Sequence, residues 1–259
     1  MSQPGQNPKA VEVRKDIFQL RSEMPGSKVY LVKGHTKNVL IDTGHGSNYS
    51  NLALGLAEIG LDPLEIHLII LTHEHFDHTG ASAYFPETTF IAAHPLAANK
   101  ISLGDEFVMH GKYLDIASKP FRVDIWLQDH SIVDLGNYKL RIMHTPGHCS
   151  GCICLHEMND RLLFTGDTVL AGGMLSGIMP SGNVSDYIAS LQRLSTLRIE
   201  EFYPGHGKIS QNAGEDLARA LEHSHRLLVE SKALFELLDS KATWRRYLLD
   251  IKSTDKPAR

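Results

Sequence analysis

The chain has 259 residues, a formal net charge of −4, a sequence pI near 6.4, and 42% hydrophobic against 22% charged residues. This composition is that of a globular protein with one large or two small domains. The acidic balance provides no general attraction to nucleic acid or anionic membrane, and no stretch approaches the roughly 18 apolar residues of a membrane span, so neither partner is expected.

The N-terminal segment 1–10, MSQPGQNPKA, is polar and contains two prolines and a glycine. It lacks the apolar core of a signal peptide, so we expect a disordered leader in a cytoplasmic protein. The sequence after residue 10 contains no short repeat and no linker, which favours a single domain over 11–259.

In the first half of the chain, apolar runs between turn signals predict strands that alternate with helices. The expected strands are 29–32, 38–44, 66–71 and 88–94, and an amphipathic helix that begins near residue 49 stops at Asp62-Pro63. Residues 95–130 are less regular and contain Phe107, Met109, Tyr113, Phe121 and Trp126. They are either a helical excursion packed on the sheet or the wall of a substrate pocket.

In the second half, two hairpins are expected over 131–144 and 152–167, with turns at Gly136-Asn137 and Asn159-Asp160. An amphipathic helix over 184–197, with Ser or Asn as its N-cap, precedes a short strand at 200–204. Residues 213–250 are mostly helical and could cover the domain or form a homodimer interface. His223 and His225 in this region are expected to be exposed.

The densest group of titratable residues, THEHFDH, follows the apolar strand 66–71 directly. His73 and His75 are two positions apart, as are His75 and Asp77, so these side chains can converge beyond the strand end, whereas His78 must point elsewhere. This spacing suits two neighbouring metal centres, and imidazole with carboxylate is the ligand set of zinc, iron or manganese.

Three further polar residues follow predicted strands next to glycines: His148 in HTPGHCSG, Asp167 in LLFTGDT and His206 in YPGHG. Alone, each is explained as an ordinary turn residue. Together with the first cluster they supply five histidines and two aspartates, and burying so many titratable groups without a metal would be costly. The sequence therefore predicts a metal centre.

These motifs, in this order and after LIDTG, closely resemble the metallo-β-lactamase superfamily and its glyoxalase II-like branch, over roughly residues 17 to 210. The resemblance implies an α+β fold, a four-layer αββα sandwich, with two divalent metal ions at one edge. It implies that His73, His75 and His148 bind the first metal, that Asp77, His78 and His206 bind the second, and that Asp167 bridges them. Asp42 of LIDTG would support the site without binding metal.

The expected activity is therefore that of a metal-dependent hydrolase, in which a metal-bridging hydroxide attacks a small ester-like carbonyl substrate. Zinc is the favoured metal, with iron or manganese as alternatives. Asp77 is the candidate catalytic residue, because it could orient the hydroxide and shuttle its proton. Thioesters or lactones are favoured over β-lactams. The alternatives are a phosphodiesterase or nuclease, an iron-dependent oxygenase of the same fold, and a partner-binding protein that keeps its metal.

The loop 171–183 lacks the GCGR signature of the glyoxalase II-like branch, which disfavours glutathione thioesters. Its residues Met174, Leu175, Ile178 and Met179 either contact an acyl chain or pack under the following helix. In zinc proteases a glutamate of this kind is the general base, but their two histidines lie four positions apart on a helix, whereas His73 and His75 are two apart. We therefore expect Glu74 to face outward, either as a residue that supports the metal ligands without binding metal or as a surface residue.

The three cysteines, Cys149, Cys152 and Cys154, are odd in number and closely spaced, which disfavours a disulfide framework. A single C-x-x-C pair does not complete a four-sulfur zinc site. Buried structural thiols are therefore expected, and Cys149, adjacent to His148, is the one placed to be reactive.

Overall fold

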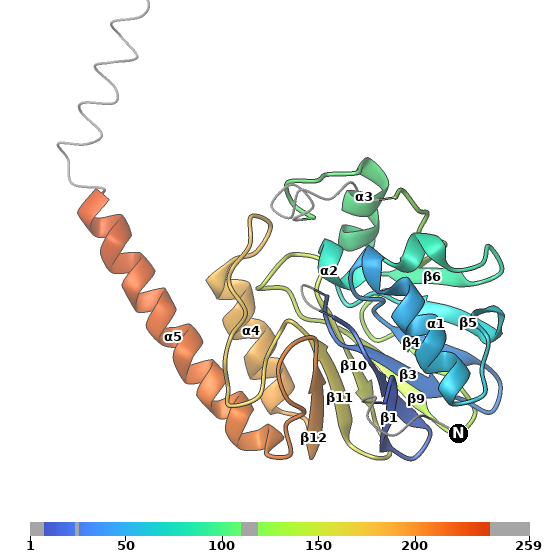
Figure 1. Cartoon of the computed structure of the whole chain (residues 1–259). Helices are drawn as coiled ribbons and strands as arrows, with labels where there is room; N and C mark the ends of the chain where they lie inside the picture. The colour runs from blue at the N-terminus through green and yellow to red at the C-terminus, as the bar shows by residue number, and fades with distance from the viewer. Residues whose placement is uncertain (1–7, 24–25, 110–118, 239–259) are drawn as a thin grey trace, which may run out of the picture.

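The computed structural model describes residues 8–23, 26–109 and 119–238. Two β-sheets lie face to face, and helices cover the outer face of each sheet (Figure 1). The expected four-layer αββα sandwich is confirmed. None of the described helices is both long enough and apolar enough to cross a lipid bilayer.

The first sheet has seven strands in chain order, antiparallel from β1 to β4 and parallel from β4 to β7. They are β1 (Ala10–Arg14), β2 (Ile17–Leu20), β3 (Val29–Lys33), β4 (Asn38–Ile41), β5 (Ile66–Ile70), β6 (Phe90–Ala93) and β7 (Ile125–Trp126). Because β4 and β5 are parallel neighbours, the residues that follow them meet at one edge of the sheet.

The second sheet has five strands in the order β12-β11-β10-β9-β8. They are β8 (Ile132–Asp134), β9 (Lys139–His144), β10 (Ile153–Glu157), β11 (Leu162–Gly166) and β12 (Glu201–Pro204). Both expected hairpins are present as the antiparallel pairs β8-β9 and β10-β11. Strands β11 and β12 are parallel, so the loops after them also share one edge.

Five α-helices and three short 3₁₀ segments lie in the described residues. They are η1 (Gly46–Asn48), α1 (Tyr49–Glu58), η2 (Pro63–Glu65), α2 (Phe76–Thr79), η3 (Ser82–Tyr84), α3 (Pro95–Leu103), α4 (Val184–Ser195) and α5 (Ala213–Leu238). Helix α4 begins after Asn183, whose side chain accepts a hydrogen bond from the Asp186 N–H. The Asn N-cap alternative is therefore the correct one.

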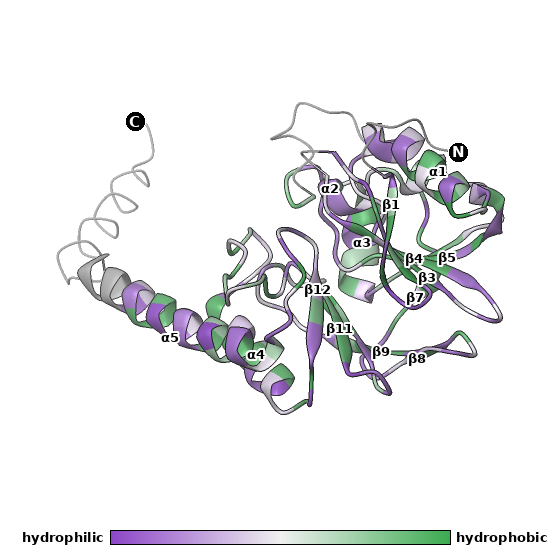
Figure 2. Cartoon of the chain, turned by 60° about the horizontal axis from the view of Figure 1, so that its bottom comes forward, coloured by the Kyte–Doolittle hydropathy of each residue, from purple (hydrophilic) through white to green (hydrophobic). Residues whose placement is uncertain are grey.

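Hydrophobic side chains form three layers that correspond to the three interfaces of the sandwich. One layer joins the first sheet to α1 and α3, the second fills the space between the sheets, and the third joins the second sheet to α4 and α5. Strands β3, β4 and β5 are predominantly hydrophobic, whereas both colours alternate along α5 (Figure 2). Because β3, β4 and β5 are covered on both faces, their sequences are continuous apolar runs, and such runs correctly predicted these strands.

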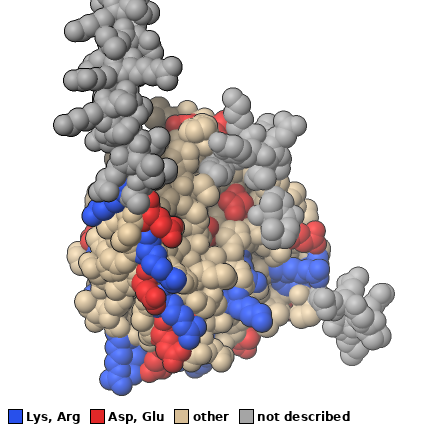
Figure 3. Space-filling view, turned by 90° about the vertical axis from the view of Figure 1, so that its left-hand side faces the viewer, with Lys and Arg blue, Asp and Glu red and all other residues tan. Residues whose placement is uncertain are grey.

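Helix α5 covers the second sheet only with its first turns. Leu217 and Ala220 are buried against α4, whereas Leu227 and Val229 are exposed, and the helix then extends away from the sandwich (Figure 1). Along its outer face Lys and Arg alternate with Asp and Glu (Figure 3), including the i,i+4 ion pair of Arg219 with Glu215. This part of the expected 213–250 helix is present, and residues 239–250 lie outside the described ones.

Two details correct the sequence predictions. The predicted leader 1–10 is too long, because β1 begins at Ala10 and the backbone N–H groups of Lys9 and Ala10 donate to the Glu58 carboxylate. His223 is not fully exposed, because its Nδ1 lies 2.9 Å from the Gly173 carbonyl oxygen, whereas His225 is exposed as expected.

In the segment 95–130, α3 is the predicted helical excursion. Met109 is buried and Phe121 partly buried in the first hydrophobic layer, whereas Phe107 and Trp126 are about half exposed. Tyr113 lies outside the described residues. The segment therefore combines core packing with exposed apolar side chains, and its backbone reaches the metal-binding motif, where the Phe76 N–H donates to the Met109 carbonyl oxygen.

Candidate metal centre

The seven predicted ligands lie in four segments that follow β5, β9, β11 and β12 at one edge of the sandwich. The structure brings all seven together. Their ligand atoms form three overlapping groups, each within 4.8 Å: His73, His75 and His148; His73, His78 and Asp167; and Asp77, His78 and His206.

The first group consists of three buried imidazoles. His75 Nδ1 lies 2.9 Å from His73 Nε2 and 3.0 Å from His148 Nε2. Three imidazole nitrogens that converge this closely could together bind one metal ion.

The second group lies nearer to solvent. His206 Nε2 lies 3.1 Å from Asp77 Oδ2 and 3.2 Å from His78 Nε2. The side chains of Asp77 and His206 are 23% and 30% exposed, whereas that of His78 is buried. A substrate can therefore reach the centre from the side of Asp77 and His206.

Asp167 faces both groups with different oxygens. Its Oδ2 lies 3.7 Å from His148 Nε2, and its Oδ1 lies 3.4 Å from His78 Nε2 and 3.7 Å from His206 Nε2. Oδ1 is buried and has no hydrogen-bond partner among the described residues. A buried carboxylate oxygen that faces imidazole nitrogens is stabilised by a shared cation, so the donor set fits a dinuclear metal site.

The backbone changes conformation inside the THEHFDH motif, and this change divides its ligands between the two groups. His75 is extended, with φ −66° and ψ 144°, and is the N-cap of α2. His73 and His75 lie before this change and converge on the first group, whereas Asp77 and His78 lie in the first turn of the helix and belong to the second group.

Asp42 orients two of the histidines from behind. Its Oδ2 accepts hydrogen bonds from His78 Nδ1 at 2.7 Å and from the Thr72 hydroxyl at 2.8 Å, and that hydroxyl in turn lies 3.0 Å from His73 Nδ1. The Nε2 atoms of His73 and His78 are thereby left free to bind metal. Asp42 adopts φ 60°, a left-handed conformation that Asp tolerates and that often marks functional sites.

The loop 171–183 braces His148. The Gly177 carbonyl oxygen accepts a short hydrogen bond from His148 Nδ1, and the Met179 N–H donates to the His148 carbonyl oxygen. The first contact fixes the His148 tautomer with Nε2 available for metal. The loop 171–183 thus positions the predicted ligand His148.

The ionisation of the centre favours cation binding. Burial lowers the pKa of His73 and of His148, so both imidazoles are neutral ligands near pH 7. Burial would raise the pKa of Asp77 and Asp167, but His78 and the other histidines outweigh it and hold both carboxyl groups below their ordinary range. Burial also acts to lower the pKa of His78, but the surrounding aspartates raise this pKa well above its ordinary value. The aspartates therefore make the electrostatic potential at the centre favourable for positive charge.

Position 205 requires glycine, because its backbone lies very close to two of the predicted ligands. A Cβ atom at this position would lie 2.5 Å from both Asp167 Oδ1 and His78 Cε1. Gly205→Ala is therefore expected to displace two ligands and lower the bound metal by at least about half while the sheets remain folded. Metal analysis with far-UV circular dichroism measures both quantities.

Gly214→Ala is the matched control, because no atom lies within 4 Å of a Cβ at position 214. Normal metal content in Gly205→Ala would contradict the prediction. The same loss of metal in both variants would show that the loss does not arise from the contacts of a Cβ at position 205 with Asp167 and His78.

Of the two expectations for Glu74, the outward-facing surface position is wrong, because the side chain is buried next to the metal-binding motif. It is fully buried, with Oε1 2.7 Å from Lys100 Nζ and 3.1 Å from the Ser181 hydroxyl, and Oε2 3.2 Å from Cys149 Sγ. This group joins α3, the metal-binding motif and the loop 171–183. Because Lys100 lies in α3 and Ser181 in a distant loop, no local sequence signal connected them to Glu74.

All three cysteines are free and buried, as expected for structural thiols. Cys149 Sγ lies 3.1 Å from Cys152 Sγ, and burial raises the pKa of Cys149 well above its ordinary value. The prediction of a reactive Cys149 is therefore not supported, because reactive thiols are accessible and have lowered pKa values.

Residues 25–206 match a family model described as the metallo-beta-lactamase superfamily. The chain is 33% identical over 204 residues to a Gallus gallus protein named acyl-coenzyme A thioesterase MBLAC2, with 70% of this chain and 72% of that protein covered. It is 33% identical over 211 residues to the probable metallo-hydrolase MJ0888 of Methanocaldococcus jannaschii, with 78% and 98% covered.

Among solved structures, the chain is similar to TTHA1623 in a di-iron-bound form. The TM-score is 0.64 and the identity 28%, with 76% of this chain and 96% of that chain covered. That protein holds two irons in the fold that the two chains share.

Proposed function

Because the chain belongs to the metallo-β-lactamase superfamily and is a metal-dependent hydrolase, we propose that it hydrolyses thioesters of small acyl groups at a dinuclear centre. The observation that carries the proposal is the Asp167 carboxylate, whose two oxygens face the two ligand groups separately. A lactone is the second candidate carbonyl substrate.

His73, His75 and His148 hold the first cation in this proposal, Asp77, His78 and His206 hold the second, and Asp167 is shared. When bound, the two cations lower the pKa of water from 15.7 toward about 7 and polarise the substrate carbonyl. Zinc is the proposed metal, with iron or manganese as alternatives.

Asp77 has the properties of a proton acceptor. Its pKa is lowered, so it is a carboxylate at neutral pH, and its side chain is partly exposed where substrate approaches. Helix α2 fixes its position, and the Ser27 N–H donates to the Asp77 carbonyl oxygen. In the proposed reaction Asp77 orients the attacking water and accepts its proton.

Specificity for an acyl group is supported by the loop 171–183. Met174 and Ile178 are 54% and 41% exposed in a loop that contacts His148 through Gly177 and Met179, whereas Leu175 packs against the third hydrophobic layer. An exposed apolar loop next to the centre suits an aliphatic chain. The relative named as an acyl-coenzyme A thioesterase supports the same substrate class.

Hydrolysis of a matched panel tests the proposal. The purified protein is assayed with an acyl thioester, a lactone, a β-lactam and a phosphodiester, together with metal analysis of the same preparation. We expect the highest kcat/KM for the thioester, loss of activity after chelation, and recovery on adding metal. Preference for the phosphodiester would replace the proposal with the nuclease alternative.

A further inference from the structure

A cavity of about 420 Å³ lies beside the metal centre, between the start of the first sheet and the loop after β12. It is lined by Pro8, Lys9, Val11, Gln19, Leu20, Arg21, Ser22, Gly26, Ser27, Lys28, His206 and Gly207. Its volume is within the usual range for small-molecule sites. His206 belongs both to the cavity wall and to the second ligand group, so the two spaces are adjacent.

Among the described residues that line the cavity, Lys9, Arg21 and Lys28 are cationic and none is a carboxylate. The side chains of Arg21 and Lys28 have no hydrogen bond or ion pair with any residue in the described ranges, whereas Lys9 Nζ donates to Asn51. Lys28 is partly buried, and this burial lowers its pKa. A partly buried ammonium without a carboxylate partner favours an anionic ligand.

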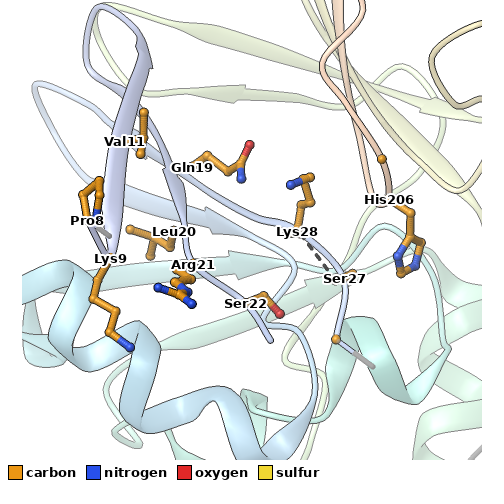
Figure 4. Close-up of a pocket in the computed structure, with 12 residues that line it drawn as sticks. Pro8, Lys9, Val11, Gln19, Leu20, Arg21, Ser22, Ser27, Lys28 and His206 are labelled. Carbon is orange, nitrogen blue, oxygen red and sulfur yellow. Dashed lines mark hydrogen bonds between the residues drawn. The ribbon is translucent and has the colours of Figure 1, made fainter. Parts of the chain in front are cut away.

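The polar side chains are distributed across the cavity. Gln19 and Lys28 point toward one another from β2 and from the residue before β3, while Arg21 and Ser22 follow β2 (Figure 4). Register pairs Leu20 with Val29 on one side and with Ala10 on the other. The cationic lining therefore spans two strand spacings, roughly 10 Å, which is wider than one phosphate group.

We propose that this cavity binds the phosphate groups of the nucleotide part of a coenzyme A thioester while the acyl end reaches the metal centre. The inference rests on the proposed thioesterase function and specifies its substrate as the coenzyme A form. Coenzyme A carries a diphosphate and a 3′-phosphate at the end opposite the thioester, connected by a flexible arm. Arg21 and Lys28 supply the charge-assisted hydrogen bonds that phosphate oxygens accept.

The position of the cavity fits this assignment. The centre is open on the side of Asp77 and His206, and the cavity begins at His206. A ligand with its phosphates near Arg21 and Lys28 approaches the metals from the exposed side. A carrier-bound substrate has only one phosphodiester on its arm, so a lining with three cations favours coenzyme A.

Binding of adenosine 3′,5′-bisphosphate, which contains no thioester, tests the site without catalysis. Calorimetry should detect binding to the metal-loaded protein, weakened about tenfold in Arg21→Ala and in Lys28→Ala and retained in Lys28→Arg. Lys33→Ala is the matched control, because Lys33 ends β3 outside the cavity and the variant has the same charge change. No binding, or equal affinity in Lys28→Ala and Lys33→Ala, overturns the proposal.

Kinetics separates this inference from the proposed function. The ratio of kcat/KM for an acyl-coenzyme A to that for the same acyl group on N-acetylcysteamine should fall about tenfold in each cavity variant, and less at high salt. Hydrolysis of both substrates with a ratio insensitive to Arg21 and Lys28 would retain the thioesterase and remove the coenzyme A site. Bisphosphate binding without thioester hydrolysis would remove the thioesterase and retain a phosphate site.

Discussion

Asp167→Asn is expected to lower kcat for thioester hydrolysis by about 10³-fold and to reduce the metal content toward one ion per chain. Asp167 is the carboxylate whose oxygens face both ligand groups. Asparagine keeps the shape but replaces one oxygen with an amide NH₂, which repels a cation. Loss of one Lewis acid removes several kcal/mol of stabilisation, and about 1.4 kcal/mol corresponds to each power of ten in rate.

Metal analysis and steady-state kinetics on the same preparations measure both effects. Asp134→Asn is a suitable control. Asp134 ends β8 at an exposed hairpin remote from the centre, and the substitution makes the same chemical change. Two tightly bound ions and near-normal kcat in Asp167→Asn would show that the bridging assignment is wrong.

Lys100→Met is expected to lower the free energy of unfolding by about 3 to 5 kcal/mol, because it leaves the Glu74 carboxylate buried without its cation. Glu74 is fully buried, and the side chain of Lys100 is only 17% exposed, so solvent cannot replace the lost partner. Denaturant unfolding at a fixed metal concentration measures the change.

Lys139→Met provides the comparison, since the Lys139–Asp134 pair is about half exposed on both sides and should contribute at most about 1 kcal/mol. The double variant Glu74→Gln/Lys100→Met should recover part of the loss, because it removes the unpaired charge. Equal effects of the Lys100 and Lys139 substitutions would mean that the buried pair adds nothing to stability.

Local patterns were sufficient to predict most of the fold. The expected strands 29–32, 38–44 and 66–71 are present as β3, β4 and β5, although β4 ends at Ile41 and β5 at Ile70. The turns at Gly136-Asn137 and Asn159-Asp160 form the expected hairpins. The pairing order of the sheets depends on contacts between distant segments. It could not be obtained from periodicity, and the family resemblance implied only the four-layer arrangement.

The candidate ligands were predictable because each follows a strand end and is flanked by glycine or by other ligand-type residues. The residues that support them were harder to identify. The Thr72 hydroxyl forms hydrogen bonds with both Asp42 and His73, and the Gly177 carbonyl oxygen accepts a hydrogen bond from His148. A hydroxyl or a backbone oxygen in such a role has no distinctive sequence signature. Arg21 and Lys28 were equally hidden, since isolated cations are common on any surface.

The chain changes from an extended conformation at His75 to a helix at Phe76. The ligands of THEHFDH therefore depend on the number of residues between them as well as on their identity. A residue inserted between His75 and Asp77 would rotate the later ligands by about 100°, the angle per residue of an α-helix. Substitutions at Phe76 can be accommodated by repacking, whereas insertions and deletions there cannot. Variation in length is therefore expected in the loop 171–183, and not within residues 73–78.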